Sequence, residues 1–320
     1  MFFEGSEKKA EVIVDNQQIS LLQHLDNEFW HRLVAKSQAQ IISQISNDHC
    51  KAYLLSESSL FVWEDRFIIL TCGVTRLVDA IAYFIEEIGL HKISYLSYQR
   101  KNEYFAHAQP SCFGDDIQIL NQYMLGRAYR FGDIDSHHNY LFHQENQYKA
   151  NPEHKTYELL TYQISPAALK HLTGKKLSTK ELREFLSLES LIPGFELDDF
   201  IFNPFGYSLN AIKGKDYLTI HITPQADSSY VSFESNMNLI RLAPAILAIL
   251  APNSFDLLTF NEQGFARQIE TYIPKNYISQ SLVSKTLTND YLVCFANFVL
   301  PQSAYTQPTE LDISGENQTL

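Results

Sequence analysis

Residues 52–71 read AYLLSESSLFVWEDRFIILT, and this stretch decides the fold class. Its two ends, 52–55 and 67–71, are apolar runs rich in aromatic and branched side chains, which is typical of strands. The segment Leu55-Ser56-Glu57-Ser58-Ser59 is a small polar interruption between apolar residues and, taken alone, predicts a serine-rich hairpin turn. The stretch therefore indicates an antiparallel sheet.

The same alternation of apolar and polar residues recurs along the chain. It predicts further strands at 10–15, 41–45, 93–97, 156–162, 217–223, 231–234, 255–260 and 291–298. Apolar residues spaced three and four apart predict helices at 27–37, 75–88, 116–124, 179–188 and 244–250, with Thr75, Thr179 and Pro244 placed to start three of them. Several strands precede each helix, so the pattern favours an α+β fold of antiparallel sheets with helices on one face.

No segment rich in Gly, Pro or Ser divides the chain, and no sequence repeat is evident. We therefore expect a single domain over residues 1–300. The polar segment 173–180 is a candidate loop at the midpoint. Residues 301–320 are polar and nearly free of large apolar side chains, so we expect a flexible tail.

Composition excludes several classes of function. The 320 residues carry 25 Lys and Arg against 37 Asp and Glu, a net charge of −12, without a basic cluster that could follow a phosphate backbone. We therefore do not expect the protein to bind nucleic acid. No apolar run approaches the roughly 20 residues of a membrane span. The four cysteines, Cys50, Cys72, Cys112 and Cys294, lack metal-site or CxxC spacing, and no secretory leader precedes them, so we expect a cytoplasmic protein.

Short motifs, which appear in a fixed order, add a resemblance to a known family. They are FFEGSEK at 2–8, YLLSESS at 53–59, TCG at 71–73, FNPFGYSLN at 202–210 and HITP at 221–224. Together with RKN at 100–102, LIPG at 191–194 and YVSFE at 230–234, they resemble the pyruvoyl-dependent S-adenosylmethionine decarboxylases of eukaryotes. The resemblance runs from Phe2 to about Phe298. It implies a four-layer αββα sandwich of two antiparallel sheets, built from two similar halves.

The resemblance also implies a proenzyme that cuts itself between Glu57 and Ser58. Decarboxylation of an α-amino acid needs an electron sink conjugated to Cα, and a ketoamide can serve as one. A serine after a strained peptide can attack the preceding carbonyl, and elimination from the resulting ester leads to a pyruvoyl group. By resemblance, residues 1–57 become the small chain and 58–320 the large one. Ser58 becomes the pyruvoyl cofactor that forms a Schiff base with S-adenosylmethionine, whose product donates aminopropyl groups for spermidine and spermine synthesis.

The resemblance assigns roles to further residues. His221 matches the family histidine that removes the Cα proton during ester elimination, and Ser208 matches the serine that assists the ester stage. Cys72 matches the residue that returns a proton to Cα after carbon dioxide leaves. The remaining matches are Phe3 and Phe202, which sandwich the adenine, Leu55 and Glu57, which contact it through their backbones, and Glu4 and Glu7, which lie near the active site.

Two positions depart from the family pattern. Gln225 stands where the family has a glutamate that accepts hydrogen bonds from both ribose hydroxyls, and an amide offers only one acceptor oxygen. The second departure is the acidic site where animal members bind the activator putrescine. Glu11, Thr156, Glu158 and Glu234 match that site, but His154 replaces an aspartate and Leu70 replaces a lysine. We expect a protonated His154 to compensate the carboxylates, and therefore little or no activation by putrescine.

Two alternatives remain open. Because of Gln225, the same pyruvoyl chemistry could act on another amino acid, such as ornithine or arginine. The resemblance also allows a non-catalytic regulatory partner of an active decarboxylase, a kind of member that the family contains. His137, His138 and His143 lack a supporting acidic or cysteine ligand, so no metal is assigned. The sequence leaves open whether the cleaved protein is a single αβ unit or a homodimer of such units.

Overall fold

The computed structural model describes residues 7–103, 106–174, 177–203, 205–225, 228–302 and 308. Within these residues the chain forms two eight-stranded sheets, in which all neighbouring strands pair antiparallel. The first sheet contains β1 (Lys8–Val14), β2 (Ile41–Ser46), β3 (Lys51–Leu55), β4 (Ser58–Val62), β5 (Arg66–Thr71), β6 (Ile93–Lys101), β7 (Gly126–Gly132) and β8 (His138–Gln144). The second contains β9 (Thr156–Tyr162), β10 (Glu196–Ile201), β11 (Tyr207–Lys213), β12 (Asp216–Thr223), β13 (Tyr230–Ser235), β14 (Ser254–Phe260), β15 (Ile278–Thr286) and β16 (Leu292–Val299).

The two halves of the chain share one topology. The strand order is β2-β3-β4-β5-β1-β6-β8-β7 in the first sheet and β10-β11-β12-β13-β9-β14-β16-β15 in the second. Adding eight to each strand number of the first sheet gives the second. The predicted pair of similar halves is therefore confirmed. The halves meet between β8 and β9, so the expected midpoint loop at 173–180 is wrong: residues there follow β9 within the second half.

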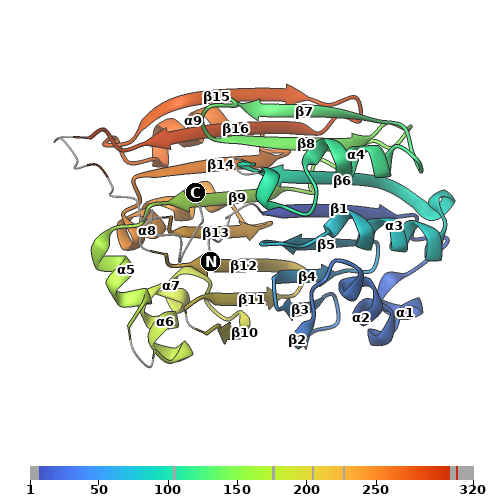
Figure 1. Ribbon diagram of the computed structural model, residues 1–320, viewed down its shortest axis with the longest axis horizontal. Helices are drawn as coiled ribbons and strands as arrows, with labels where there is room; N and C mark the ends of the chain where they lie inside the picture. The colour runs from blue at the N-terminus through green and yellow to red at the C-terminus, as the bar shows by residue number, and fades with distance from the viewer. Residues whose placement is uncertain are drawn as a thin grey trace.

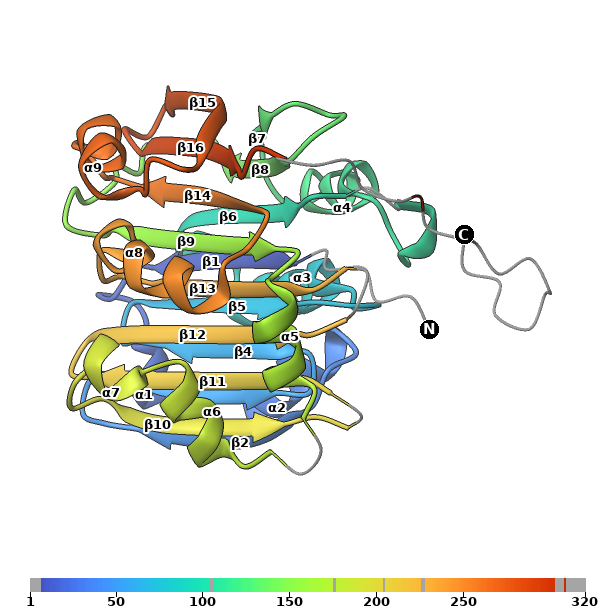
Figure 2. The same cartoon turned by 90° about the vertical axis from the view of Figure 1, so that its left-hand side faces the viewer.

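Helices lie on the outer faces of the stacked sheets, so the layers run helix, sheet, sheet, helix (Figures 1 and 2). The first half contributes α1 (Leu21–His24), α2 (Asn27–Lys36), α3 (Leu77–Ile88), α4 (Phe113–Leu120) and the 3-10 turns η1 (Leu90–Lys92) and η2 (Ala106–Ala108). The second half contributes α5 (Pro166–Leu172), α6 (Thr179–Phe185), α7 (Leu188–Leu191), α8 (Leu239–Leu250) and α9 (Phe265–Tyr272). The predicted α+β class and αββα sandwich are confirmed.

Each sheet packs on its helices through one large apolar core, and the sheets pack on each other through two smaller clusters. One inter-sheet cluster includes Tyr95 and Leu141 with Tyr291 and Phe295, and the other includes Phe61 and Leu70 with Tyr217. The inner faces of the sheets also carry buried polar side chains, described below. Burial of this apolar surface on both faces of each sheet is the main favourable contribution to folding.

Several predicted boundaries differ from the observed ones. Helix α8 begins at Leu239, where the Asn238 side chain accepts a hydrogen bond from the Arg241 N–H, and Pro244 lies inside the helix instead of starting it. Strands such as β10 and β15 lack the expected apolar alternation because they lie at sheet edges and are partly or fully exposed. No helix within the described residues is long and apolar enough to cross a membrane. Residues 303–307 and 309–320 of the expected tail lie outside the described residues.

Candidate active site

The residues Ser56 and Glu57 form the turn between β3 and β4, so the predicted hairpin is present. Strand alternation directs Leu60 and Val62 to the helical core and Phe61 to the second sheet. In a regular strand Ser58 would face the helices with Leu60. Ser58 instead has φ +141, a conformation that L-residues rarely adopt, and its hydroxyl reaches across to the second sheet. The unusual φ of Ser58 therefore goes together with a hydroxyl that lies between the two sheets and not on the helical side.

His221 on β12 is the centre of a group of buried hydroxyls. Its Nε2 lies 2.9 Å from Ser58 Oγ, 2.8 Å from Thr219 Oγ1 and 3.3 Å from Ser59 Oγ. Its Nδ1 lies 2.9 Å from Ser208 Oγ on β11. Burial lowers the pKa of His221 to about 4, so the imidazole is neutral at pH 7 and one ring nitrogen keeps a lone pair.

Strand register explains why these side chains converge. Ser208 pairs with His221 and Asn210 pairs with Thr219 across β11 and β12, and residues two apart on a strand face the same side. Ser59 Oγ of β4 donates a 2.6 Å hydrogen bond to Asn210 Oδ1 from the other sheet. We call Ser58, Ser59, Ser208, Asn210, Thr219 and His221 the hydroxyl–imidazole cluster. The sequence interpretation gave no role to Ser59, Asn210 or Thr219. Asn210 and Thr219 lie two residues from Ser208 and His221 on the same strands, and this spacing could have indicated them. Ser59 directly follows Ser58 and has no such spacing.

Cys72 follows β5 and contacts the carbonyl of the turn residue Glu57. That carbonyl oxygen accepts hydrogen bonds from the Cys72 N–H at 2.9 Å and from its Sγ at 3.1 Å. Burial raises the pKa of the Cys72 thiol well above its usual range, and the carboxylates of Glu57 and Glu7 add to the effect. Cys72 is therefore a protonated thiol at neutral pH, able to donate a hydrogen bond or a proton.

A second polar group between the sheets is ionic. Lys9 Nζ lies 2.8 Å from Glu158 Oε1 and 2.9 Å from Glu234 Oε1, and Lys101 Nζ lies 2.7 Å from Glu158 Oε2 and also contacts Glu7. All five side chains are at most 2% exposed. We call them the ionic cluster. Beside it, Arg66 pairs with Glu11 at 3.4 Å. Lys9 and Lys101 were also missed by the sequence interpretation.

The observed cations correct the expectation for His154. Burial lowers the pKa of His154, and the nearby Arg66 adds to the effect, so this imidazole is neutral at pH 7. Compensation of the buried carboxylates comes instead from Lys9, Lys101 and Arg66. Leu70 packs in the apolar inter-sheet cluster with Tyr217, and Thr156 is buried at the start of β9.

The remaining predicted site residues belong to neither cluster, apart from Glu7, and two of them are not among the described residues. Phe3 and Glu4 lie outside the described residues. Glu7 Oε2 accepts a 2.9 Å hydrogen bond from Ser232 Oγ. Leu55 is fully buried, and Phe202 packs edge-on against Phe200. Gln225 Oε1 accepts a 2.9 Å hydrogen bond from Ser228 Oγ.

The three histidines considered for a metal point to separate partners. His137 Nδ1 lies 2.9 Å from Asp256, while His138 and His143 lie within hydrogen-bond distance of the carbonyls of Ser136 and Gln144. Across the part of the chain that the structure describes, no group of three potential metal ligands gathers.

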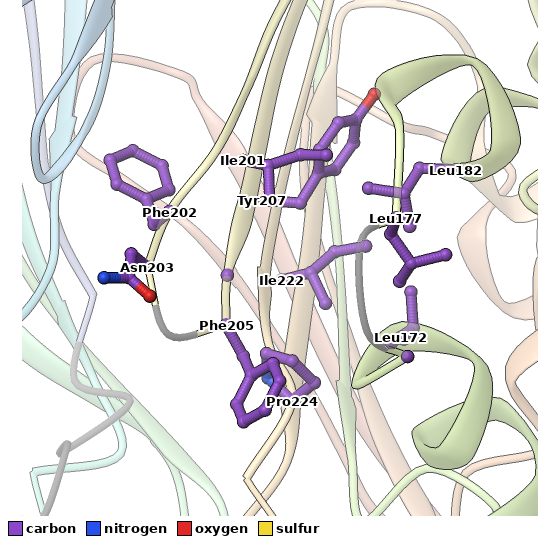
Figure 3. A pocket seen from close by; sticks show the side chains of 12 residues that line it. Leu172, Leu177, Leu182, Ile201, Phe202, Asn203, Phe205, Tyr207, Ile222 and Pro224 are labelled. Carbon is purple, nitrogen blue, oxygen red and sulfur yellow. The ribbon is translucent and has the colours of Figure 1, made fainter.

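A pocket of about 210 Å³ has the predicted site residue Phe202 in its lining but no residue of the hydroxyl–imidazole cluster. It is lined by apolar side chains on the helical side of the second sheet, among them Leu182, Ile222 and Phe205 (Figure 3). In Figure 3 the Phe202 ring points away from Leu177 and Leu182. None of Ser58, Cys72 and His221 lines the pocket, so the arrangement of reactive side chains identifies the candidate site better than cavity size does.

Comparison with known proteins relates the whole chain to one family. The family described as adenosylmethionine decarboxylase matches residues 1–299. The S-adenosylmethionine decarboxylase proenzyme of Dictyostelium discoideum is 33% identical over 288 residues, which cover 82% of this chain and 75% of that protein. The S-adenosylmethionine decarboxylase proenzyme of Xenopus laevis is 32% identical over 285 residues, which cover 82% of this chain and 84% of that protein. The solved structure of a Trypanosoma brucei AdoMetDC monomer aligns with a TM-score of 0.60 at 22% identity, covering 76% of this chain and 99% of that one, which shows a common fold.

Proposed function

The chain belongs to the adenosylmethionine decarboxylase family, and on this premise we propose that it is a proenzyme that cleaves itself between Glu57 and Ser58 and then decarboxylates S-adenosylmethionine. One observation carries the proposal: Ser58 Oγ lies 2.9 Å from Nε2 of a neutral, buried histidine. In the tautomer that donates from Nδ1 to Ser208 Oγ, this Nε2 has a lone pair and can act as the base. A nucleophile, its base and a third group that orients the base are the parts that acyl transfer needs. Here they are Ser58, His221 and Ser208.

Self-cleavage begins with attack of Ser58 Oγ on the carbonyl carbon of Glu57. His221 Nε2 accepts the hydroxyl proton, while the Cys72 N–H and thiol donate to the developing oxyanion on the Glu57 oxygen. Collapse of this adduct breaks the peptide C–N bond and leaves an ester between Glu57 and the Ser58 oxygen. The unusual φ at Ser58 is consistent with a strained starting peptide.

The ester is then removed by elimination. His221 takes the Cα proton of residue 58, the Cα–Cβ double bond forms, and Glu57 leaves as the carboxylate at the end of the small chain. The remaining enamine becomes an imine, which water hydrolyses to the pyruvoyl group and ammonia. We propose that the products 1–57 and 58–320 remain in the one folded unit, because β3 and β4 pair on either side of the cut.

The surroundings of Ser58 fit a pyruvoyl group, because the position is buried and bordered by neutral hydrogen-bond donors. That group supplies the electron sink for loss of the substrate carboxylate. Cys72, a thiol held protonated by burial, is the proposed donor of the proton that replaces carbon dioxide on the substrate Cα. Phe202 and Phe3 would stack on the adenine, Gln225 would accept from one ribose hydroxyl, and the backbones of Leu55 and Glu57 would hold the nucleobase.

We further propose that the enzyme works without a diamine activator. The activator residues Glu11, Glu158 and Glu234 already face ammonium or guanidinium groups of the same chain. Burial alone would lower the pKa of Lys9, but Glu158 and Glu234 outweigh it and raise that pKa, so Lys9 stays charged. A buried cation occupies the electrostatic role that a bound diamine would fill.

The test compares the parent protein with a Ser58→Ala variant by intact mass, followed by carbon dioxide release from S-adenosylmethionine, ornithine and arginine. We expect two fragments split after Glu57 in the parent alone, with a pyruvoyl-blocked large chain and turnover of S-adenosylmethionine. Preference for ornithine or arginine would overturn the substrate assignment. An uncut, inactive parent would overturn the proposal and leave the regulatory-partner alternative.

A further inference from the structure

More hydroxyl groups surround His221 Nε2 than this one atom can accept hydrogen bonds from. Three hydroxyls, those of Ser58, Ser59 and Thr219, lie within 3.3 Å of the single Nε2 atom of His221. A neutral imidazole nitrogen has one lone pair and accepts one good hydrogen bond. Thr219, at 2.8 Å, is nearer to Nε2 than Ser58 is. If Thr219 donated there, it would occupy the lone pair that the chemistry requires for Ser58.

The structure offers Thr219 a different acceptor. Its Oγ1 lies 3.0 Å from Ser59 Oγ, and the proton of Ser59 is committed elsewhere, because Ser59 donates to Asn210 Oδ1 at 2.6 Å. A hydroxyl has one proton and two acceptor lone pairs, so a serine that donates to Asn210 remains free to accept from Thr219. The three side chains thus form a directed chain, Thr219 to Ser59 to Asn210.

We infer that this chain of hydrogen bonds turns the competing hydroxyl protons away from His221, so that the Nε2 lone pair is kept for Ser58 and then for its Cα proton. Thr219, Ser59 and Asn210 are positioning residues in this scheme, since they act through His221. The inference rests on the proposed self-cleavage. It adds a role for three residues that the family resemblance did not assign.

Burial makes the arrangement specific to these partners. Ser59 and Asn210 are fully buried and Thr219 is 1% exposed, so water is not available to take over a lost hydrogen bond. Ser208 Oγ lies 2.9 Å from the other ring nitrogen, Nδ1, so Nδ1 is not available to a competing donor. A change at Ser59 therefore redirects the Thr219 proton to the nearest remaining acceptor, which is His221 Nε2.

The test is a suppression experiment on full-length chains made by cell-free translation, with cleavage followed over time. Ser59→Ala removes the acceptor of Thr219 and should slow cleavage about five- to tenfold, the effect of one competing hydrogen bond of ordinary strength. Ser59→Ala combined with Thr219→Val removes the competitor as well and should return the rate to within about twofold of the parent. Thr219→Val alone should not cleave faster than the parent, because Thr219 does not donate to Nε2 in the parent.

A merely structural role predicts a different pattern, because a second cavity or lost contact would add to the first. A double variant as slow as Ser59→Ala would overturn the inference. So would a Thr219→Val protein that cleaves several-fold faster than the parent, since Thr219 would then be donating to Nε2 in the parent. Asn210→Leu is the independent check: it frees the Ser59 proton, should slow cleavage, and should be partly rescued by Thr219→Val.

Two controls separate the possible failures. Each substitution is also made in the uncleavable Ser58→Ala chain, where thermal unfolding reports whether the fold tolerates it. A parent that is never cut after Glu57 would refute the proposed function itself. A parent that is cut normally, with Ser59→Ala equally fast, would refute only the hydrogen-bond chain.

Discussion

Two polar regions lie between the same two sheets, and they are built in opposite ways. The hydroxyl–imidazole cluster is neutral, with His221 surrounded by hydroxyls and an amide. The ionic cluster pairs Lys9 and Lys101 with carboxylates. Burial lowers the pKa of His221 because no counter-charge touches it, whereas the two ammonium groups outweigh burial and lower the pKa of Glu158. For His221 and Glu158, which are both buried, the presence or absence of charged partners makes the difference. Burial still dominates at Glu234, where it raises the carboxyl pKa to about 7 although Lys9 lies 2.9 Å away.

The largest effect should come from the neutral region. His221→Ala removes the proposed base, and loss of a general base slows a reaction by about 10² to 10⁴-fold. Self-cleavage should fall in this range, and any chain that reaches the ester should accumulate there and be cut by hydroxylamine. Gel analysis with and without hydroxylamine measures both. His143→Ala is the matched control, because His143 is also buried but bonds only to the Gln144 carbonyl among the contacts described. Equal cleavage in the two variants would contradict a role for His221 as base.

The next effect should come from the ionic region and appear as lost stability. Glu158 contacts both Lys9 and Lys101, so Glu158→Gln leaves two buried ammonium groups short of a counter-charge. Breaking a buried pair in this way costs about 3–5 kcal/mol. Denaturant unfolding of the uncleavable Ser58→Ala chain measures it. Glu184→Gln, at an exposed pair with Lys180, should change stability by less than about 1 kcal/mol. A loss below about 1 kcal/mol for Glu158→Gln would contradict the view that this cluster is held by charge balance.

A smaller effect is expected from pH, and its sign follows from the His221 pKa of about 4. The folded state binds this proton less tightly than the unfolded state, whose histidine has a pKa near 6.5. The contribution to stability is therefore complete above about pH 6.5 and is lost as the pH falls toward 4, on the order of 3 kcal/mol in total. Unfolding of Ser58→Ala chains with and without His221→Gln isolates this contribution from those of His143 and His154. Parallel stability curves between pH 7 and 4 would contradict it.

The sequence predicted the two regions unequally. Ser58, Ser208, His221 and Cys72 stand in short motifs, and the structure brings the first three into contact and sets Cys72 on the Glu57 carbonyl. The φ of +141 at Ser58 has no sequence signal, because any residue type except glycine disfavours it. Lys9 and Lys101 were missed since their partner, Glu158, is 149 residues from Lys9. The alternation of side chains along β1 indicates on which face of the first sheet Lys9 lies, but not which residues of the second sheet lie opposite it.

Burial of both faces of a strand did not by itself make the strand predictable. Strands β8 and β11 are buried along most of their length but were not predicted, whereas the half-exposed edge strand β2 was. The central strands β1 and β9 are buried along nearly their whole length and were predicted, although each carries at least one charged side chain. The edge strand β15 is exposed at all but one position and was not predicted. The similarity of the two halves leaves no evident repeat in the sequence, and only the family resemblance implied it. Repeated topology needs only a repeated pattern of buried and exposed positions, which many side chains satisfy.

The smallest predicted effect is that of putrescine, which should hardly change the reaction rates. Lys9 lies between Glu158 and Glu234, so millimolar putrescine should change the rates of self-cleavage and of carbon dioxide release by less than about twofold. A clear rate increase in the parent would show that Lys9 does not fill the activator role. The comparison is sharpened by Lys9→Met, which keeps a long unbranched side chain but removes its charge. That variant should cleave more slowly and be partly restored by the diamine, because the ionic region would keep Lys101 but lose the ammonium group that lies between Glu158 and Glu234. His221 and its hydroxyls would remain as they are.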